Sequence, residues 1–463
     1  MEVFIINTFK GSFTLSSFRD PSGFIFIRGG KIYRQVNISY KEHYDHLMSG
    51  LYGALAKAKL LVSHDEVDVQ EGNDTVYKII KPEIIPFISY PYEWCFSQLK
   101  HAALVTLQIQ KTALNFGMSL KDSSAYNIQF NNGKPIFIDT LSFEKYNEGE
   151  PWVAYRQFCQ HFLAPLSLMS LNHISLNQLL RIYIDGIPLD LTSRLLPNKT
   201  WMNFNLLSNI HLHASTQKRY QNKLVNISNK KISLTGLLAI IDNLESTIKR
   251  LTWKPQGTEW AEYYKDINYT EDGIEHKKHL LAKYLEVIDP ESVWDIGANK
   301  GIFSRIASNR GIQTLSFDID PAAVEKNYLI SLKNKETNIL PLLIDLTNPS
   351  PSIGWENTER LSLLERGPAD TVFALAIIHH LAISNNLPLS KIANFFGKLC
   401  KNLIIEFVPK EDSQVQKLLA TREDVFPNYE KNCFENEFKK HFVVLRLDQI
   451  TDSKRTLYLL SRR

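Results

Sequence analysis

The sequence predicts an α/β chain of two parts, an N-terminal α+β domain over residues 1–250 and a C-terminal domain with a parallel sheet over residues 253–463. Residues 291–320 read as strand, glycine turn, helix and strand, which is the pattern of a nucleotide-type βαβ unit. Strand and helix patterns alternate from there to the end of the chain. A length of 463 residues is also more than one hydrophobic core ordinarily organises.

The N-terminal domain is expected to begin with a hairpin and to become mostly helical over residues 151–250. Two alternating β-rich runs flank Gly29 and Gly30, which is typical of a hairpin turn. Apolar residues at helical spacing predict helices at residues 44–61, 94–116, 152–171, 176–184 and 232–251. Prolines predict an extended or edge segment at residues 76–90 and a loop at residues 188–197.

A group of polar residues follows the second predicted helix. Asp122 precedes Asn127 by five residues, a hairpin turn is expected at Asn132 and Gly133, and Asp139 ends the next strand. The spacing resembles the catalytic and metal-binding loops of the protein-kinase-like and aminoglycoside-phosphotransferase folds, which implies a base and magnesium ligands at these three positions. The histidine before the catalytic Asp and a glycine-rich nucleotide loop are missing. The alternative is a loop and hairpin whose polar groups cap neighbouring helices.

The βαβ unit of the C-terminal domain carries candidate ligand-binding groups. Asp295 lies in the first strand, and Gly297, Asn299 and Gly301 lie in the turn that follows it. Glycine lets the backbone turn sharply and approach a ligand closely, and the start of the next helix offers unpaired N–H groups. Asp318 ends the second strand, where a carboxylate can accept both hydroxyls of a ribose. The alternative is an ordinary tight turn.

The spacing from Asp295 to Gly301, D-x-G-x-x-x-G, resembles motif I of the class I S-adenosylmethionine (SAM) methyltransferases. The resemblance implies a Rossmann-like, seven-stranded domain in which this loop and Asp318 bind SAM. It also implies that Asp345, after the third strand, binds the adenine. Asn299 replaces a frequent glycine, and Asn tolerates the same backbone angles.

The remaining elements of the C-terminal domain complete five βα units and a terminal antiparallel hairpin, which is the class I topology. The predicted strands cover residues 293–296, 339–344, 372–377, 403–408, 442–447 and 456–461. The predicted helices cover residues 272–287, 321–332, 389–400 and 412–419.

Two histidines, His379 and His380, lie where class I enzymes place groups that face the methyl acceptor. One of them could remove a proton from a hydroxyl or amine while the methyl group transfers. We expect His380 to be that base, because Ile377 and Ile378 prolong the buried strand. Two alternatives stay open: a metal site formed with Glu406, and a packed structural pair.

Two other groups of residues are candidates for contacts with the ligands. Aromatic residues before the first helix of the C-terminal domain could form a lid over SAM or close the domain seam. They are Trp260, Tyr263, Tyr264 and Tyr269. A long connection before the fourth strand carries candidate substrate-side groups. They are Trp355, Asn357, Glu359 and Arg360.

The tail of the chain, including residues 353–384 and 403–419, resembles the bacterial nodulation-protein-like methyltransferases (the NoeA type). This implies transfer of a methyl group from SAM to an oxygen or nitrogen acceptor on a glycan or small metabolite, with the N-terminal domain helping to select the acceptor. The IIHHL sequence at 377–381 excludes the Asp/Asn-Pro-Pro motif of nucleic-acid amino-methylating enzymes. The alternatives are a phosphotransferase centred on Asp122, Asn127 and Asp139, and a SAM-binding scaffold without turnover.

The composition is that of a globular protein, with 44% apolar and 22% charged residues. A net charge of +4 gives no strong sign of a nucleic-acid partner. The four cysteines form no CxxC pair, which predicts reduced thiols and no sequence-local zinc site. Because the sequence shows neither a signal peptide nor an apolar run of about 20 residues, we expect a cytoplasmic protein without a membrane partner. The oligomeric state stays open.

Overall fold

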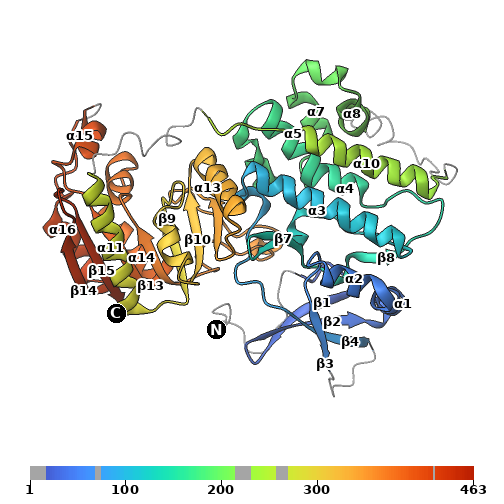
Figure 1. Cartoon of the computed structure of the whole chain (residues 1–463), viewed down its shortest axis with the longest axis horizontal. Coiled ribbons are helices and arrows are strands. Elements are labelled where there is room, and N and C mark those ends of the chain that lie inside the picture. Colours follow the sequence, from blue (N-terminus) through green and yellow to red (C-terminus); the bar gives the residue numbers. More distant parts are fainter. Residues whose placement is uncertain (1–16, 68–74, 214–230, 257–269, 421–422) are drawn as a thin grey trace. The chain divides into compact units, whose positions relative to one another are not determined.

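The computed structural model describes residues 17–67, 75–213, 231–256, 270–420 and 423–463. The chain divides into two compact units (Figure 1). Unit 1 comprises Met1–Lys254 together with Gly354–Arg360, and unit 2 comprises Pro255–Ile353 and Leu361–Arg463. None of the described helices is long and apolar enough to cross a membrane.

Unit 1 contains a four-stranded antiparallel sheet of order β1-β2-β4-β3. Its strands are β1 (Gly23–Arg28), β2 (Lys31–Asn37), β3 (His64–Val67) and β4 (Val76–Pro82). The predicted hairpin is confirmed, because β1 pairs with β2 around Gly29 and Gly30, both at positive φ. Of the two alternatives predicted for residues 76–90, the extended segment is confirmed by β4, whereas the edge position is wrong, since β4 lies between two strands. Proline is tolerated there because Pro82 is the last residue of the strand.

The rest of unit 1 is mostly helical. The long helix α3 (Phe96–Asn115) is confirmed and ends before Gly117, whose φ of 68° suits a helix C-terminus. The loop predicted at 188–197 is wrong, because Pro188 precedes helix α7 (Leu189–Leu195), and proline at a helix start removes no needed donor. The other helices are α1 (Lys41–His46), α2 (Tyr52–Lys57), α4 (Tyr155–Phe158), α5 (Ala164–Leu171), α6 (Leu179–Ile182), α8 (Phe204–Leu206) and α10 (Leu234–Arg250). Two small sheets pair β5 (Met118–Leu120) with β8 (Phe143–Lys145) and β6 (Ile128–Asn131) with β7 (Lys134–Phe137).

Unit 2 is a mixed α/β domain with one large sheet, as predicted. The sheet order is β11-β10-β9-β12-β13-β15-β14, with the first five strands parallel and β15 antiparallel to both of its neighbours, β13 and β14. Its strands are β9 (Ser292–Ile296), β10 (Gln313–Asp318), β11 (Ile339–Leu343), β12 (Ala369–Ala374), β13 (Cys400–Phe407), β14 (Phe442–Gln449) and β15 (Thr456–Arg462). The helices are α11 (Glu271–Ile288), α12 (Ser304–Ser308), α13 (Pro321–Asn334), α14 (Leu389–Leu399), α15 (Ser413–Leu419) and α16 (Lys431–Lys439), the last of which was not predicted.

The order of the parallel strands reverses between β9 and β12. The chain moves from β9 outward to β10 and β11, and then returns to place β12 on the other side of β9. The register pairs Ile296 with both Phe317 and Ala374, and Ala374 with Ile405, so the carboxyl ends of these strands share one edge. Such a reversal leaves a crevice at the carboxyl ends, where ligands bind in open α/β sheets.

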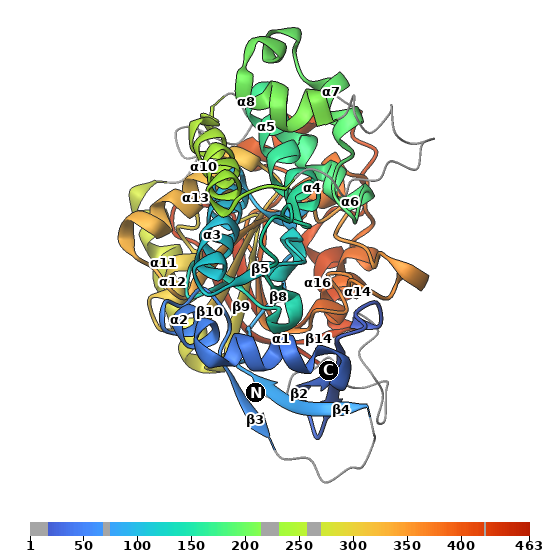
Figure 2. The ribbon, with the colours of Figure 1, turned by 90° about the vertical axis from the view of Figure 1, so that its right-hand side faces the viewer.

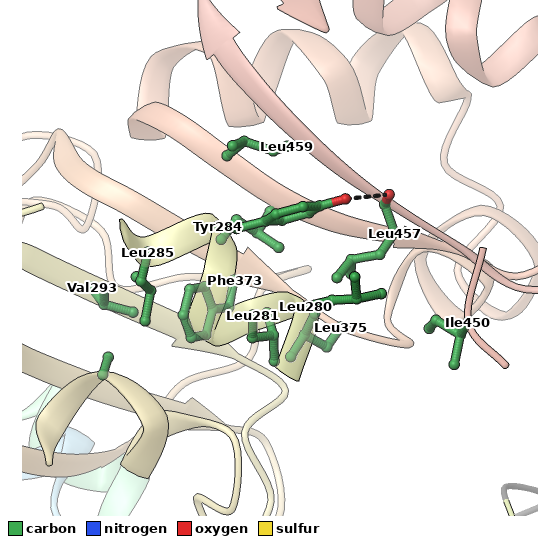
Figure 3. Packing of buried hydrophobic residues seen from close by; sticks show 12 residues of the cluster. Leu280, Leu281, Tyr284, Leu285, Val293, Phe373, Leu375, Ile450, Leu457 and Leu459 are labelled. Atoms are coloured by element: carbon green, nitrogen blue, oxygen red, sulfur yellow. Dashed lines mark hydrogen bonds between the residues drawn. The ribbon is translucent and has the colours of Figure 1, made fainter. Parts of the chain in front are cut away.

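Helix α11 covers one face of this sheet (Figure 3). Its residues Leu280, Leu281, Tyr284 and Leu285 pack against strand residues that include Phe373 and Leu457. The Tyr284 hydroxyl donates hydrogen bonds to the Asp448 carboxylate (2.7 Å) and to the Leu457 carbonyl (3.3 Å). The buried face of α11 is therefore fixed against β15 as well as the parallel strands. Lys277 lies one turn earlier, at helical spacing from Leu280 and Leu281.

Candidate functional site

The turn after β9 adopts the backbone that its glycines allow. Gly297, Asn299 and Gly301 have φ values of 75°, 48° and 74°, the left-handed region that glycine and asparagine tolerate best. The Asn299 amide donates a 2.7 Å hydrogen bond to Asp318 Oδ2 at the end of β10. The turn is thereby tied to the neighbouring strand, as the predicted site requires.

Both glycines of the turn are packed against neighbours. A Cβ on Gly297 would lie 3.2 Å from Ile377 Cδ1, and one on Gly301 would lie 2.6 Å from the Asn327 side chain on α13. Gly301 therefore allows close packing inside the domain. The next helix begins at Ser304, later than predicted, and is five residues long.

Asp318 is buried and holds two turns together. Its Oδ2 accepts from the Asn299 amide and its Oδ1 accepts from the Asp320 amide at 2.8 Å. Burial raises the pKa of Asp318 to about 6, although the backbone hydrogen bonds oppose the shift. Each carboxylate oxygen can accept a further hydrogen bond. The group can thus hold the turn and receive two hydroxyls of a ligand.

Asp295 and Asp345, the other two predicted acidic groups, make local contacts. Asp295 is buried, and its Oδ2 accepts a 2.6 Å hydrogen bond from the Ser304 hydroxyl, which joins β9 to the start of α12. Burial raises the pKa of Asp295 to about 7. Asp345 is half-buried and accepts hydrogen bonds from the amide and hydroxyl of Thr347. Both residues lie at the carboxyl ends of parallel strands, Asp295 in β9 and Asp345 just beyond β11.

The two histidines lie on a helical turn beyond β12, because the strand ends at Ala374, earlier than predicted. The turn runs from His380 to Ser384, and the His379 and His380 rings are 4.2 Å apart between centroids. His379 is 2% exposed and its Nδ1 has no hydrogen-bond partner among the described residues, whereas His380 is half-buried. His380 is the more exposed of the two, as predicted, but the helical turn is the reason, and the strand extension assumed from the sequence is absent.

Both histidines are neutral at pH 7. Burial lowers the pKa of His380 to about 4, and the positive charge of Arg455 adds to the effect. Burial and its charged neighbours hold the pKa of His379 well below the usual value. A neutral imidazole can accept a proton, so either residue has the protonation state of a general base.

A buried network of charges was missed by the sequence analysis. Lys277 Nζ lies 2.5 Å from Glu406 Oε2, and Arg455 Nη1 lies 3.2 Å from Glu406 Oε1. Arg455 also binds the Asp412 carboxylate, with a shortest distance of 2.7 Å. All four side chains are less than 9% exposed. Lys277 is therefore buried, although nothing in the sequence distinguishes it from its more exposed neighbour Lys278.

This network includes the glutamate of the metal alternative. Both carboxylate oxygens of Glu406 are paired with cations, so Glu406 is an ion-pair partner of Lys277 and Arg455. Within the described ranges, no group of three or more His, Cys, Asp or Glu side chains could hold a metal ion. Lys277 Nζ also lies 4.4 Å from the Phe303 ring centroid, so the network extends to the turn after β9.

The candidate substrate-side residues of the long connection belong to unit 1. Glu359 is 6% exposed and accepts a 2.7 Å hydrogen bond from Arg19 Nε. The Arg360 guanidinium lies 4.6 Å from the centroid of the Tyr126 ring. Trp355 is 62% exposed and Asn357 is exposed. The aromatic residues predicted as a lid, Trp260, Tyr263, Tyr264 and Tyr269, lie outside the described residues.

Unit 1 brings Asp122, Asn127 and Asp139 close together. Burial raises the pKa of Asp122, the charge of Asp139 adds to the shift, and hydrogen bonds from Gln157 and Asn127 oppose it. Asp139 Oδ1 lies 2.5 Å from Arg34 Nη1 and also accepts from the Leu141 amide. An oxygen that the kinase-like interpretation assigns to magnesium is thus held by an arginine. The phosphotransferase alternative stays a prediction.

No protein-family model matches the chain. Among solved structures, it resembles magnesium protoporphyrin IX methyltransferase (ChlM) from Synechocystis PCC 6803 with bound SAH, at 15% identity over 44% of this chain and 93% of that chain, with a TM-score of 0.31. It also resembles the bifunctional kinase-methyltransferase WbdD, at 14% identity over 42% of this chain and 40% of that chain, with a TM-score of 0.28. At these identities and TM-scores, neither likeness bears on the activity of this chain.

A curated relative matches almost the whole sequence. The nodulation protein NoeA of Rhizobium meliloti (strain 1021) is 33% identical over 454 residues, which cover 96% of this chain and 95% of that protein. The resemblance to the NoeA type is therefore confirmed, and it extends through unit 1 as well as the tail from which it was inferred. The protein belongs to the family of the nodulation protein NoeA.

Proposed function

We propose that unit 2 binds SAM and transfers its methyl group to an oxygen or nitrogen acceptor. The observation that carries the proposal is the arrangement at the strand-order reversal. The Gly297–Gly301 turn and Asp318 lie on one side of it, and His379 and His380 lie on the other. The crevice between β9 and β12 is where open α/β sheets bind ligands.

The residues of the turn fit SAM. Gly297 is exposed and has no side chain, so a ligand can approach the backbone closely at this point of the turn. Asp318 is a buried carboxylate with acceptor capacity left for two ribose hydroxyls. Asp345 lies at the next strand end, where it could accept from an adenine amino group. Bound SAM would supply a methyl group on a positively charged sulfur.

The chain's own residues supply the proton acceptor. We assign this role to His380, whose imidazole is neutral, half-buried and on the acceptor side of the crevice. It would take the proton that a hydroxyl or amine loses as the methyl group transfers. Arg455 raises the energy of an imidazolium beside it, so His380 stays unprotonated between turnovers.

The acceptor class we propose is a hydroxyl or amine of a glycan or small metabolite. The charge that acts on both histidines, Arg455, is paired within the protein with Glu406 and Asp412. A neutral acceptor suits such a compensated environment better than a carboxylate does, because a buried anion without a counter-ion is costly. The resemblance to the NoeA-type methyltransferases points to the same class of acceptor.

Calorimetry with SAM, S-adenosylhomocysteine (SAH) and ATP–magnesium tests the assignment. We expect binding of SAM and SAH, and weaker binding in Asp318→Ala by roughly 1–3 kcal/mol. A second assay measures transfer of a labelled methyl group from SAM to pools of sugars and amines. Transfer would show that the protein is an enzyme, and its absence would support a scaffold that binds SAM without turnover. Magnesium-dependent ATP binding that Asp139→Asn abolishes would instead support the phosphotransferase alternative in unit 1.

A further inference from the structure

A small helical lobe of unit 1 exposes large apolar side chains. It consists of α7, the turn η9 (Asn198–Met202), α8 and the turn η10 (Leu207–His211), and we call it the α7–η10 lobe. Trp201, Met202 and Phe204 are 46%, 91% and 75% exposed. Apolar side chains this exposed are ordinary when scattered, but neighbouring ones indicate an interaction site.

The local structure holds these side chains outward. The Asn203 side chain caps α8 by accepting from the amides of Asn205 (3.1 Å) and Leu206 (3.2 Å). The cap fixes the chain between Met202 and Phe204, while Leu206 on the other side of the short helix is buried. The exposure of Met202 and Phe204 is therefore a consequence of a well-formed turn.

Trp201 is held by the lobe itself. Its ring stacks on the buried His211 ring, with centroids 4.3 Å apart and an angle of 16° between the planes. His211 is fixed in turn by hydrogen bonds with the hydroxyls of Ser193 (2.7 Å) and Thr200 (2.9 Å). The indole is thus supported on one face and exposed along part of its surface.

The lobe contains one acid, Asp190, and begins a basic stretch of the sequence. From residue 191 to residue 241 the sequence contains no Asp or Glu, while it contains seven Lys and Arg residues, more than the net charge of +4 of the whole chain. Arg194 and Lys199 lie in the lobe and are exposed. The partner of this surface should therefore be anionic.

We propose that the α7–η10 lobe docks the protein on an anionic lipid surface, with Trp201, Met202 and Phe204 inserted among the headgroups. Protruding apolar side chains on a surface where cations outnumber acids suit an interfacial lipid contact. The lobe lies at the end of unit 1 farthest from the four-stranded sheet in both views (Figures 1 and 2), so it is not covered by that sheet. A lipid contact here would run against the expectation of no membrane partner, which was drawn from the lack of a signal peptide and of a long apolar run.

Co-sedimentation of the full chain with vesicles tests the proposal. Vesicles of phosphatidylglycerol mixed with phosphatidylcholine should bind the protein, vesicles of phosphatidylcholine alone should bind it weakly, and added salt should weaken binding. The double variant Met202→Ser/Phe204→Ser should bind the anionic vesicles at least tenfold more weakly, because the inserted apolar area is lost. Arg194→Glu/Lys199→Glu should lower the affinity by a similar factor.

The matched control is Val153→Ser, which removes another exposed apolar side chain of unit 1, 64% exposed and outside the lobe. Its vesicle binding should equal that of the parent protein. The melting temperature of each variant verifies that it is folded. Substitutions of exposed side chains should leave this temperature nearly unchanged. Absence of binding to anionic vesicles, or equal binding by the Met202→Ser/Phe204→Ser variant, overturns the proposal. Gel filtration could also overturn the proposal. If the parent protein is an oligomer and the Met202→Ser/Phe204→Ser variant is a monomer, the lobe binds a second copy of the chain.

Discussion

His380 and His379 are adjacent in sequence but differ in what the structure lets them do. If His380 is the base, turnover should rise with pH through a group near its pKa of about 4. The rise would then not be centred on the reference histidine pKa of about 6.5, which the sequence alone suggests. His380→Gln should lower turnover by about 100-fold or more and leave SAM affinity unchanged. The measurement is the pH dependence of the turnover rate beside calorimetry with SAM.

The control for this prediction is His379→Gln. His379 is almost fully buried, so its loss should lower the melting temperature and change turnover per folded molecule little. Both histidines have folded-state pKa values below the unfolded value, so their contribution to stability is present above pH about 6.5 and is lost as pH falls, toward about 4 in the case of His380. If turnover is unaltered in His380→Gln and strongly lowered in His379→Gln, His379 is the base.

Asp318 should control the affinity for SAH through its charge. Asp318→Asn replaces an acceptor with a donor beside the Asn299 and Asp320 amides, so SAH binding should weaken by roughly 1–3 kcal/mol. In the parent protein, affinity should fall as pH drops through about 6, because the protonated acid accepts fewer hydrogen bonds. Asp320→Asn is the control, since Asn is an equally good cap for α13. Equal SAH affinities for the two variants, measured by calorimetry, would place the ribose elsewhere.

At the level of single residues, the sequence predicted the features that depend on residues close together in the chain. The turn from Gly297 to Gly301 follows from glycine spacing, and Asp318 from its place at a strand end. The pairing of Lys277 with Glu406 could not be predicted, because the partners are 129 residues apart and no pattern links them. The same holds for Arg34 and Asp139 in unit 1. Long-range ion pairs need the fold before they can be recognised.

Helix α11 is the element that carries the charge network toward the crevice. Lys277 and Lys278 are adjacent on it, yet one is 2% exposed and paired with Glu406 whereas the other is 35% exposed and paired with Glu275. Lys277→Met should destabilise unit 2 by about 3–5 kcal/mol, because it leaves a buried carboxylate short of a partner. Lys278→Met should stay within about 0.5 kcal/mol. Urea unfolding compares the two variants.

The double variant Lys277→Met/Glu406→Gln sharpens the comparison. Removing both charges leaves Arg455 paired with Asp412, so the double variant should be less destabilised than Lys277→Met alone. Additive effects would mean that the two side chains do not interact. Burial lowers the pKa of Lys277 while Glu406 opposes the shift, so loss of Glu406 should ease deprotonation of the lysine.

The helix and strand boundaries show where local patterns are sufficient. The predicted strands and helices of unit 2 appear with ends shifted by a few residues, because apolar periodicity decides burial along a regular element. The errors arise where the backbone leaves the regular pattern. Strand β12 stops at Ala374 and Ala376 adopts a φ of 51°, although the apolar run continues to Ile378. Because of this bend, the histidines lie on a helical turn and do not follow directly on the strand.

At the scale of the whole molecule, the chain passes between its two units more than once. Gly354–Arg360 belongs to unit 1 although the residues on both sides of it belong to unit 2. The sequence indicated a long connection of functional character but not its attachment. Glu359 and Arg360 were assigned to the substrate side of unit 2, and the structure places their contacts on Arg19 and Tyr126.

This attachment predicts which unit responds when the segment is loosened. Arg360→Ala removes the guanidinium from the face of Tyr126, an interaction of about 0.5–2 kcal/mol depending on its desolvation. Amide exchange in residues 118–131 of unit 1 should then speed up several-fold, and exchange in β9 to β13 should stay the same. Glu356→Ala, an exposed change in the same segment, is the control. Faster exchange in β9 to β13 with no change at Tyr126 would show that the segment is held by unit 2.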